Sequence, residues 1–145
     1  MLTDITRVHP IRLPEDCNPA KLEACRAYAR MLNTLDASHL EPWLDENVKH
    51  ESQWVFDEIV GKEKYLKYIR GKLRTIHEKG PPVWAEIAYT NAFGAGPCVI
   101  IAQPEKDEWV ATLLLEMNGD KISRMDMCFL PSPLECRRTG EAPGT

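Results

Sequence analysis

The sequence predicts a single α+β domain in which three helices pack against an antiparallel sheet. A length of 145 residues is typical of one domain and allows a sizeable core. Apolar residues recur at helical spacing only in the first part of the chain, up to Lys79. After Lys79, short apolar stretches alternate with turn sequences, a pattern that favours a β-meander. We therefore expect an extended lead-in over residues 1–17, the folded domain over residues 18–130 and a loosely held tail over residues 131–145.

The first two helices have recognisable starting signals. Asn18 can cap a helix, and Pro19 suits the first helical position. The apolar face of this helix is expected to contain Leu22, Cys25, Tyr28 or Ala29, Leu32 and Leu35. Ser38 and Glu41 then form an S-x-x-E capping pattern that predicts a short second helix burying Leu40, Trp43 and Leu44.

The third helix is expected to follow Gly61 and to end near Lys79, before the Gly80-Pro81-Pro82 stop signal. Its buried stripe is predicted to be Leu66, Ile69, Leu73 and Ile76. Basic residues outnumber acidic ones on it: Lys62, Lys64, Lys67, Arg70, Lys72, Arg74 and Lys79 against Glu63 and Glu78. This excess indicates either an anion-facing surface or a solvated outer face. The solvated face is favoured, because no aromatic or glycine-rich element accompanies the charge.

Five strands are predicted. The first, from Val48 to Val55, alternates so that Val48, His50, Ser52 and Trp54 point inward. The meander strands are expected at residues 83–91, 98–103, 109–117 and 121–129. A two-residue turn at Asn118-Gly119 would place Thr112 opposite Met125.

That register would divide the last hairpin into two largely apolar faces. One would hold Val110, Thr112, Leu114, Met125, Met127 and Phe129, and the other Trp109, Ala111, Leu113, Leu115, Arg124, Asp126 and Cys128. An antiparallel sheet with one solvated face should instead alternate apolar and polar residues. Because three helices can cover one face only, we expect a homodimer through the outer face.

Composition excludes several classes of protein. The net charge of -4 argues against nucleic-acid binding, which depends on basic contacts to phosphate. The longest apolar run, residues 98–102, is far too short to span a membrane, and the N-terminal region lacks a signal-peptide core, so we expect a cytoplasmic protein. Five cysteines without C-x-x-C spacing favour reduced thiols, and no histidine spacing indicates a metal site. No cofactor is predicted.

The order of elements, together with several segments, resembles the NTF2-like superfamily and, within it, the SnoaL-like group. The segments are residues 28–36 (YARMLNTLD), 44–48 (LDENV), 61–69 (GKEKYLKYI) and 119–125 (GDKISRM). The resemblance covers roughly residues 20–130. It implies a cone-shaped, cystatin-like α+β fold in which a curved antiparallel sheet wraps around a long helix and encloses an apolar pocket, and it implies dimerisation through the outer sheet face.

Two of the chemistries known in this superfamily use carboxylates at positions where the resemblance places other residues in this chain. The resemblance places Ser52 where ketosteroid isomerases have their aspartate base, and it places Thr112 near their second acidic residue. A serine hydroxyl is no carboxylate base near neutral pH. Compared with limonene epoxide hydrolases, Met127 occupies the catalytic carboxylate position. Asp126 lies one residue away, on the opposite face of its strand, where pairing with Arg124 is favoured over catalysis.

His50 is the candidate catalytic residue, because imidazole exchanges protons near physiological pH and the strand alternation points it inward. A structural histidine in an apolar interior is the alternative. The candidate ligand-binding residues are Tyr28, Trp43, Ser52, Trp54, Thr112, Met125, Met127 and Phe129. They predict a pocket for a small apolar or aromatic molecule, held by a binding protein or by an isomerase, cyclase or hydrolase that lacks the usual carboxylates. The alternative is a dimeric interaction module whose cavity is filled by side chains.

Overall fold

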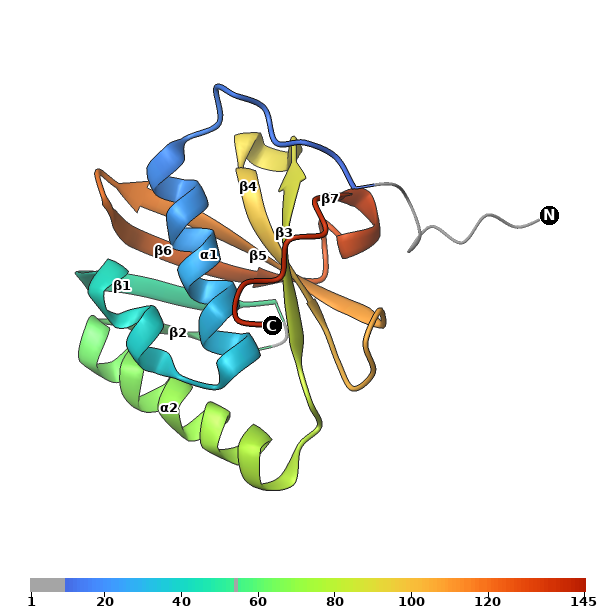
Figure 1. Cartoon of the computed structure of the whole chain (residues 1–145). Helices are drawn as coiled ribbons and strands as arrows, with labels where there is room; N and C mark the ends of the chain where they lie inside the picture. Colours follow the sequence, from blue (N-terminus) through green and yellow to red (C-terminus); the bar gives the residue numbers. More distant parts are fainter. Residues whose placement is uncertain (1–9, 54) are drawn as a thin grey trace.

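The computed structural model describes residues 10–53 and 55–145. Within them, helices α1 (Pro19–Thr34) and α2 (Lys62–Lys79) pack on a curved sheet whose strand order is β2-β1-β6-β5-β4-β3-β7 (Figure 1). The strands are β1 (Leu44–Ser52), β2 (Val55–Val60), β3 (Trp84–Thr90), β4 (Gly96–Ala102), β5 (Trp109–Asn118), β6 (Lys121–Cys128) and β7 (Arg137–Arg138). The predicted α+β class and wrapped sheet are confirmed.

Both helices contribute to one core on the concave face of the sheet. Helix α1 crosses β3, β4, β5 and β6, whereas α2 packs mainly on β1 and β2. Helix α1 begins as its sequence predicts, because the side chain of Asn18 accepts a hydrogen bond from the Lys21 amide at 3.1 Å. The predicted stripe of α2 is also confirmed at Leu66, Ile69 and Leu73, which are buried.

The expected short second helix is present as two 3₁₀ turns, Ala37–His39 and Glu41–Trp43. Its start differs from the prediction, because Asp36 rather than Ser38 is the capping residue and accepts a hydrogen bond from the Ser38 amide at 2.9 Å. Pro42 lies at the start of the second turn, where the missing amide hydrogen is tolerated. Leu40 and Leu44 are buried as expected.

The first strand begins and ends earlier than predicted, because Val55, its expected last residue, starts a second strand. Strand β1 begins at Leu44, and β2, which the sequence analysis did not anticipate, returns antiparallel to it, with Ser52 opposite Val55. On its other side β1 runs parallel to β6, with His50 next to Met125. The sheet is therefore mixed rather than entirely antiparallel.

The four predicted meander strands correspond to β3–β6, but the register of the last hairpin was wrong. Asn118 pairs with Lys121, so Gly119 and Asp120 form the turn, and an irregularity follows between Glu116 and Met117. The partner of Thr112 is consequently Cys128 instead of Met125. An additional residue in one strand places the following side chains of that strand on the opposite face of the sheet. The two proposed face groups are therefore mixed: Leu113, Leu115 and Met125 face the main core, whereas Thr112 faces outward.

The C-terminal segment is docked rather than loose. Strand β7 pairs with β3, and the Arg138 guanidinium binds both carboxylate oxygens of Glu86 at 2.8 Å. Farther along, the Asn33 side chain donates a hydrogen bond to the carbonyl of Pro143 at 2.8 Å, which ties the end of the chain to α1 (Figure 1). Residues 131–145 thus belong to the folded domain.

This docking also explains part of the second apolar face of the sheet. Cys136 packs with Ala88, Cys98 and Ile100 in a small cluster on the outer face. The sequence analysis expected a second copy of the chain to cover the whole outer face of the sheet. The chain's own C-terminal segment covers part of that face instead.

Candidate functional site

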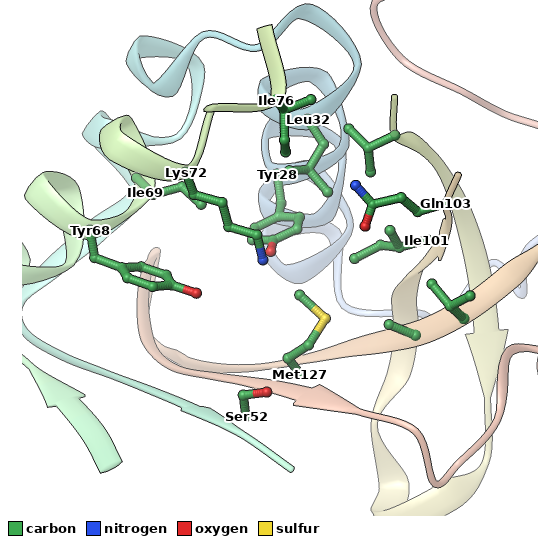
Figure 2. A pocket seen from close by; sticks show the side chains of 13 residues that line it. Tyr28, Leu32, Ser52, Tyr68, Ile69, Lys72, Ile76, Ile101, Gln103 and Met127 are labelled. Atoms are coloured by element: carbon green, nitrogen blue, oxygen red, sulfur yellow. The ribbon is translucent and has the colours of Figure 1, made fainter. Parts of the chain in front are cut away.

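A pocket of about 340 Å³ lies between the two helices and the concave face of the sheet (Figure 2). Its apolar lining comes from both layers: Leu32, Ile69, Ile76, Val83, Ile101, Val110, Ala111 and Met127. Its polar lining consists of Tyr28, Ser52, Tyr68, Lys72 and Gln103. Tyr68 is 39% exposed and Lys72 is also exposed, so the pocket reaches the surface beside α2.

The position of α2 follows from its own sequence spacing. Tyr68, Lys72 and Ile76 are four residues apart and therefore lie on one side of the helix, which faces the pocket. The neighbouring Ile69 and Leu73 anchor that helix in the core. Figure 2 shows the Lys72 amine and the Tyr68 hydroxyl directed into the space opposite Met127 and Ser52.

The inner polar groups are uncharged at neutral pH. Burial raises the pKa of the Tyr28 and Tyr65 hydroxyls above the usual value for tyrosine, so both stay protonated. Gln103 donates a hydrogen bond to the Pro81 carbonyl at 2.9 Å, which fixes its amide at the edge of the pocket. The pocket therefore offers neutral hydrogen-bonding groups and the one lysine among its described lining residues.

His50 lies behind the pocket rather than in its lining. It is 6% exposed, and its ring packs against Tyr65 and Tyr68 with centroid distances of 5.3 and 5.7 Å. Burial first, and then the positive charges of Lys72 and Arg124, lower the pKa of His50 to about 4, although Asp126 opposes this shift. The imidazole is therefore neutral at pH 7. Its Nδ1 is buried and has no hydrogen-bond partner among the described residues.

Three of the predicted ligand-binding residues, Tyr28, Ser52 and Met127, line the pocket. Met125 is fully buried in the core, and Trp43 packs at the edge of that core. Trp54 lies outside the described residues.

The other two predicted ligand-binding residues lie elsewhere. Thr112 is buried on the outer face, 4.0 Å from the Cys136 sulfur, because of the register difference described above. Phe129 is half exposed and follows the end of β6. Neither residue lines the pocket.

The sequence analysis missed Tyr68, Lys72 and Gln103. Lys72 was assigned with the other basic residues of α2 to a solvated face, whereas the structure places it at the pocket. The signal was available, since a lysine four residues after Tyr68 and four before Ile76 interrupts an otherwise uncharged helical stripe. Gln103 offered no such signal, because it directly follows β4, where the sequence does not distinguish a loop residue from a pocket residue.

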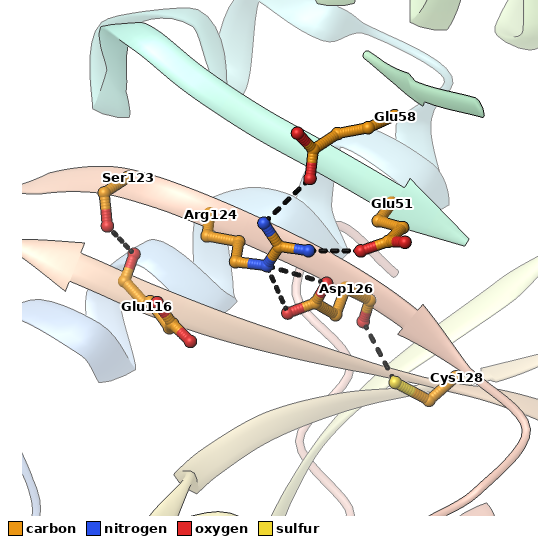
Figure 3. Close-up of polar contacts among 7 residues, drawn as sticks. All are labelled: Glu51, Glu58, Glu116, Ser123, Arg124, Asp126 and Cys128. Carbon is orange, nitrogen blue, oxygen red and sulfur yellow. Dashed lines mark hydrogen bonds and ion pairs between the residues drawn. The ribbon is translucent and has the colours of Figure 1, made fainter. Parts of the chain in front are cut away.

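Asp126 lies on the outer face, as the strand alternation predicts. Its carboxylate accepts hydrogen bonds from Arg124 Nε at 3.0 and 3.1 Å (Figure 3). The same guanidinium pairs with Glu58 at 2.9 Å and with Glu51. The expected pairing of Asp126 with Arg124 is confirmed, and the carboxylates of Glu51, Glu58 and Asp126 are all paired with this one guanidinium.

Neither a metal centre nor a membrane-spanning helix is found in the described part of the chain. No group of three His, Cys, Asp or Glu residues there is arranged to hold a metal ion. No helix in it is long and apolar enough to cross a membrane.

Comparison with solved structures identifies the fold. A SnoaL-like protein of unknown function from Burkholderia thailandensis superposes with a TM-score of 0.59 at 16% identity, over 83% of this chain and 98% of that one. The chain has an NTF2-like fold. A ketosteroid isomerase candidate from Kribbella flavida gives a TM-score of 0.55 at 20% identity, over 74% of this chain and 76% of that one. A polyketide cyclase candidate from Sinorhizobium meliloti gives 0.52 at 13% identity, over 70% and 90% of the two chains.

The NTF2-like fold that the resemblance implies is thus confirmed by structure. No family model matches the sequence, and no curated protein matches it.

Proposed function

We propose that this NTF2-like chain binds a small apolar or aromatic molecule in the pocket between α2 and the sheet. The observation that carries the proposal is a cavity of about 340 Å³ with mostly apolar walls and a few polar groups. Small-molecule sites commonly have this composition and a volume of roughly 300–1,000 Å³. Phe129, which could have filled the cavity, is not among its lining residues.

A thermal-shift screen against steroids, terpenoids and aromatic polyketides tests the proposal. A ligand at about 100 times its dissociation constant adds roughly 2.7 kcal/mol of stability, which raises Tm by about 5–10 °C in a chain of this size. Two variants locate the site. Ala111→Phe fills the pocket from β5, and Ile76→Trp fills it from the partly exposed rim of α2, so one of them remains useful if the other folds poorly.

The expected result is a shift in the wild-type protein that both filled variants lose. If no compound stabilises the wild type, the proposal fails and the alternative, a dimeric interaction module, becomes the better account. If a compound stabilises wild type and filled variants equally, its site lies elsewhere on the molecule.

Catalysis is a second candidate function, and one observation favours it. His50 is neutral at pH 7, and its buried Nδ1 has no hydrogen-bond partner among the described residues, so the ring retains a site that can accept a proton. A reaction would require movement of Tyr68, which lines the pocket, packs against the His50 ring and is the more exposed of the two tyrosines that contact it. His50→Gln should then abolish turnover and leave ligand affinity unchanged.

We also propose that the outer sheet face binds a second copy of the chain. Phe93 is 89% exposed, and Leu130 is exposed as well. Both border a hollow of about 380 Å³ on the outer face that Leu114 and Cys128 also line. Exposed apolar surface of this kind is typical of interaction sites.

A further inference from the structure

Lys72 is the charged residue of the pocket, and its surroundings differ from those of the other basic residues on α2. Arg70, for example, lies on the side of α2 opposite Tyr68, Lys72 and Ile76 and pairs with Glu41 at 3.2 Å. Lys72 forms no ion pair with any carboxylate of the described residues, and none of those that line the pocket is acidic. Its amine instead points over Ile69 and Tyr28 into the cavity (Figure 2).

The surroundings of this amine favour a single negative charge. Apolar walls screen charges poorly, so an anion close to Lys72 gains more from the pairing than it would at an open surface. The positive charge of Lys72 already reaches His50, whose protonation it opposes. The nearby hydroxyls of Tyr68 and Tyr28 are neutral hydrogen-bond donors. One cation with neutral donors matches a monoanion such as a carboxylate, whereas a phosphate would call for additional basic groups.

We propose that the ligand of this pocket is a small aromatic or alicyclic carboxylic acid, bound with its carboxylate at Lys72 and Tyr68 and its apolar body between Leu32, Ile101 and Met127. This inference rests on the proposed binding function and specifies the class of ligand. Two sets of residues contribute: Lys72 and Tyr68 of α2 select the charge, and the apolar side chains of α1 and the sheet select an apolar ring system.

Matched pairs of probes test the inference by isothermal titration calorimetry. Each pair contains an acid and its neutral amide: benzoate and benzamide, cinnamate and cinnamamide, 2-naphthoate and 2-naphthamide. The proteins are the wild type, Lys72→Met and the control Lys67→Met. Lys67 is an exposed lysine of the same helix that does not line the pocket, so both variants remove the same charge. Methionine is a good helix former, and circular dichroism verifies folding.

We expect the wild type to bind at least one acid about 10-fold or more tightly than its amide, as a charge-assisted hydrogen bond permits. Lys72→Met should remove that preference by weakening acid binding about 10-fold, with amide affinity within about 2-fold of the wild type. Lys67→Met should retain the wild-type preference.

The contrary results separate this inference from the function on which it rests. Equal affinity for acid and amide in the wild type, or equal weakening of both in Lys72→Met, overturns the carboxylate assignment while the pocket remains a binding site. A wild type that binds none of these probes overturns the carboxylate assignment. If it also fails to respond to the apolar screen, the proposed function fails with it.

Discussion

Replacing Arg138 by alanine should unfold the protein at markedly lower denaturant concentration, because it leaves a buried carboxylate without its cation. Glu86 is 6% exposed, and its two oxygens accept hydrogen bonds of 2.8 Å from Arg138. The guanidinium also stacks on the Trp109 ring at 4.8 Å, and its charge is stabilised by the carboxylate, which raises the pKa of Arg138. The pair thus joins β7 to β3 and to β5 in one contact.

The expected cost follows from the burial of the carboxylate. Removing one partner of a buried ion pair typically costs about 3–5 kcal/mol. The lower end applies here, because the Arg138 side chain is 19% exposed and the Gly140 amide still donates to Glu86 at 3.3 Å. A loss of about 3 kcal/mol corresponds to a decrease in Tm of roughly 6–12 °C for a domain of this size.

Urea denaturation followed by tryptophan fluorescence measures this loss. The matched control is Arg137→Ala, which removes the same charge from the exposed neighbouring position of β7 and should change the free energy of unfolding by less than about 0.5 kcal/mol. The double variant Glu86→Leu/Arg138→Met should recover most of the lost stability, since it removes both charges. If Arg138→Ala is no less stable than Arg137→Ala, the C-terminal segment is not held by this pair.

Three further predictions concern the histidine, the chemistry and the assembly. Burial lowers the folded-state pKa of His50 to about 4, below its unfolded value, so the histidine contributes stability above pH 6.5 and loses that contribution as the pH falls toward 4. Between pH 8 and pH 5 the free energy of unfolding of the wild type should therefore fall by about 2 kcal/mol more than that of His50→Gln. Equal decreases in the two proteins would contradict this. The chain should not isomerise a Δ5-3-ketosteroid, because the resemblance places Ser52, a pocket residue, where ketosteroid isomerases have their base, and loss of a positioned base costs about 10²–10⁴ in rate. Robust turnover in a spectrophotometric assay would refute this. Light scattering should give twice the 16.5 kDa of one chain. Phe93→Asn should shift the equilibrium to the monomer, and asparagine tolerates the positive φ of 54° at this exposed position. An unchanged mass for the variant would show that Phe93 is outside the interface.

The parts of the fold that sequence predicts well are those encoded by local patterns. Asn18 marks the start of α1, and the stripe of Leu66, Ile69 and Leu73 on α2 is buried as its spacing indicates. Strand parity also places Asp126 on the outer face beside Arg124. Each of these depends on neighbours close in sequence, where helical or strand geometry leaves few alternatives.

The features that sequence did not predict depend on contacts distant in sequence or on a one-residue difference in register. The irregularity after Glu116 moved Thr112 from the expected pocket to the outer face, and no local composition distinguishes the two registers. The docking of the C-terminal segment depends on Arg138 meeting Glu86, a contact between residues 52 positions apart. The pocket position of Lys72 was not predicted for another reason. Lys72 was grouped with the exposed lysines of its helix, although its spacing of four residues from both Tyr68 and Ile76 places it on their side of α2.

The most direct test of the central claim, that this chain binds a small molecule between α2 and the sheet, is a protein NMR titration with the tightest-binding compound of the screen. Binding at the pocket should move the amide resonances of Ile69, Lys72, Ile101 and Met127, which line it from three sides, and leave that of the outer-face residue Thr112 unchanged. Saturable shifts at the four pocket positions, absent in Ala111→Phe, are the result that we expect. Saturable shifts confined to the outer face, or shifts that are unaffected by Ala111→Phe, would contradict the claim.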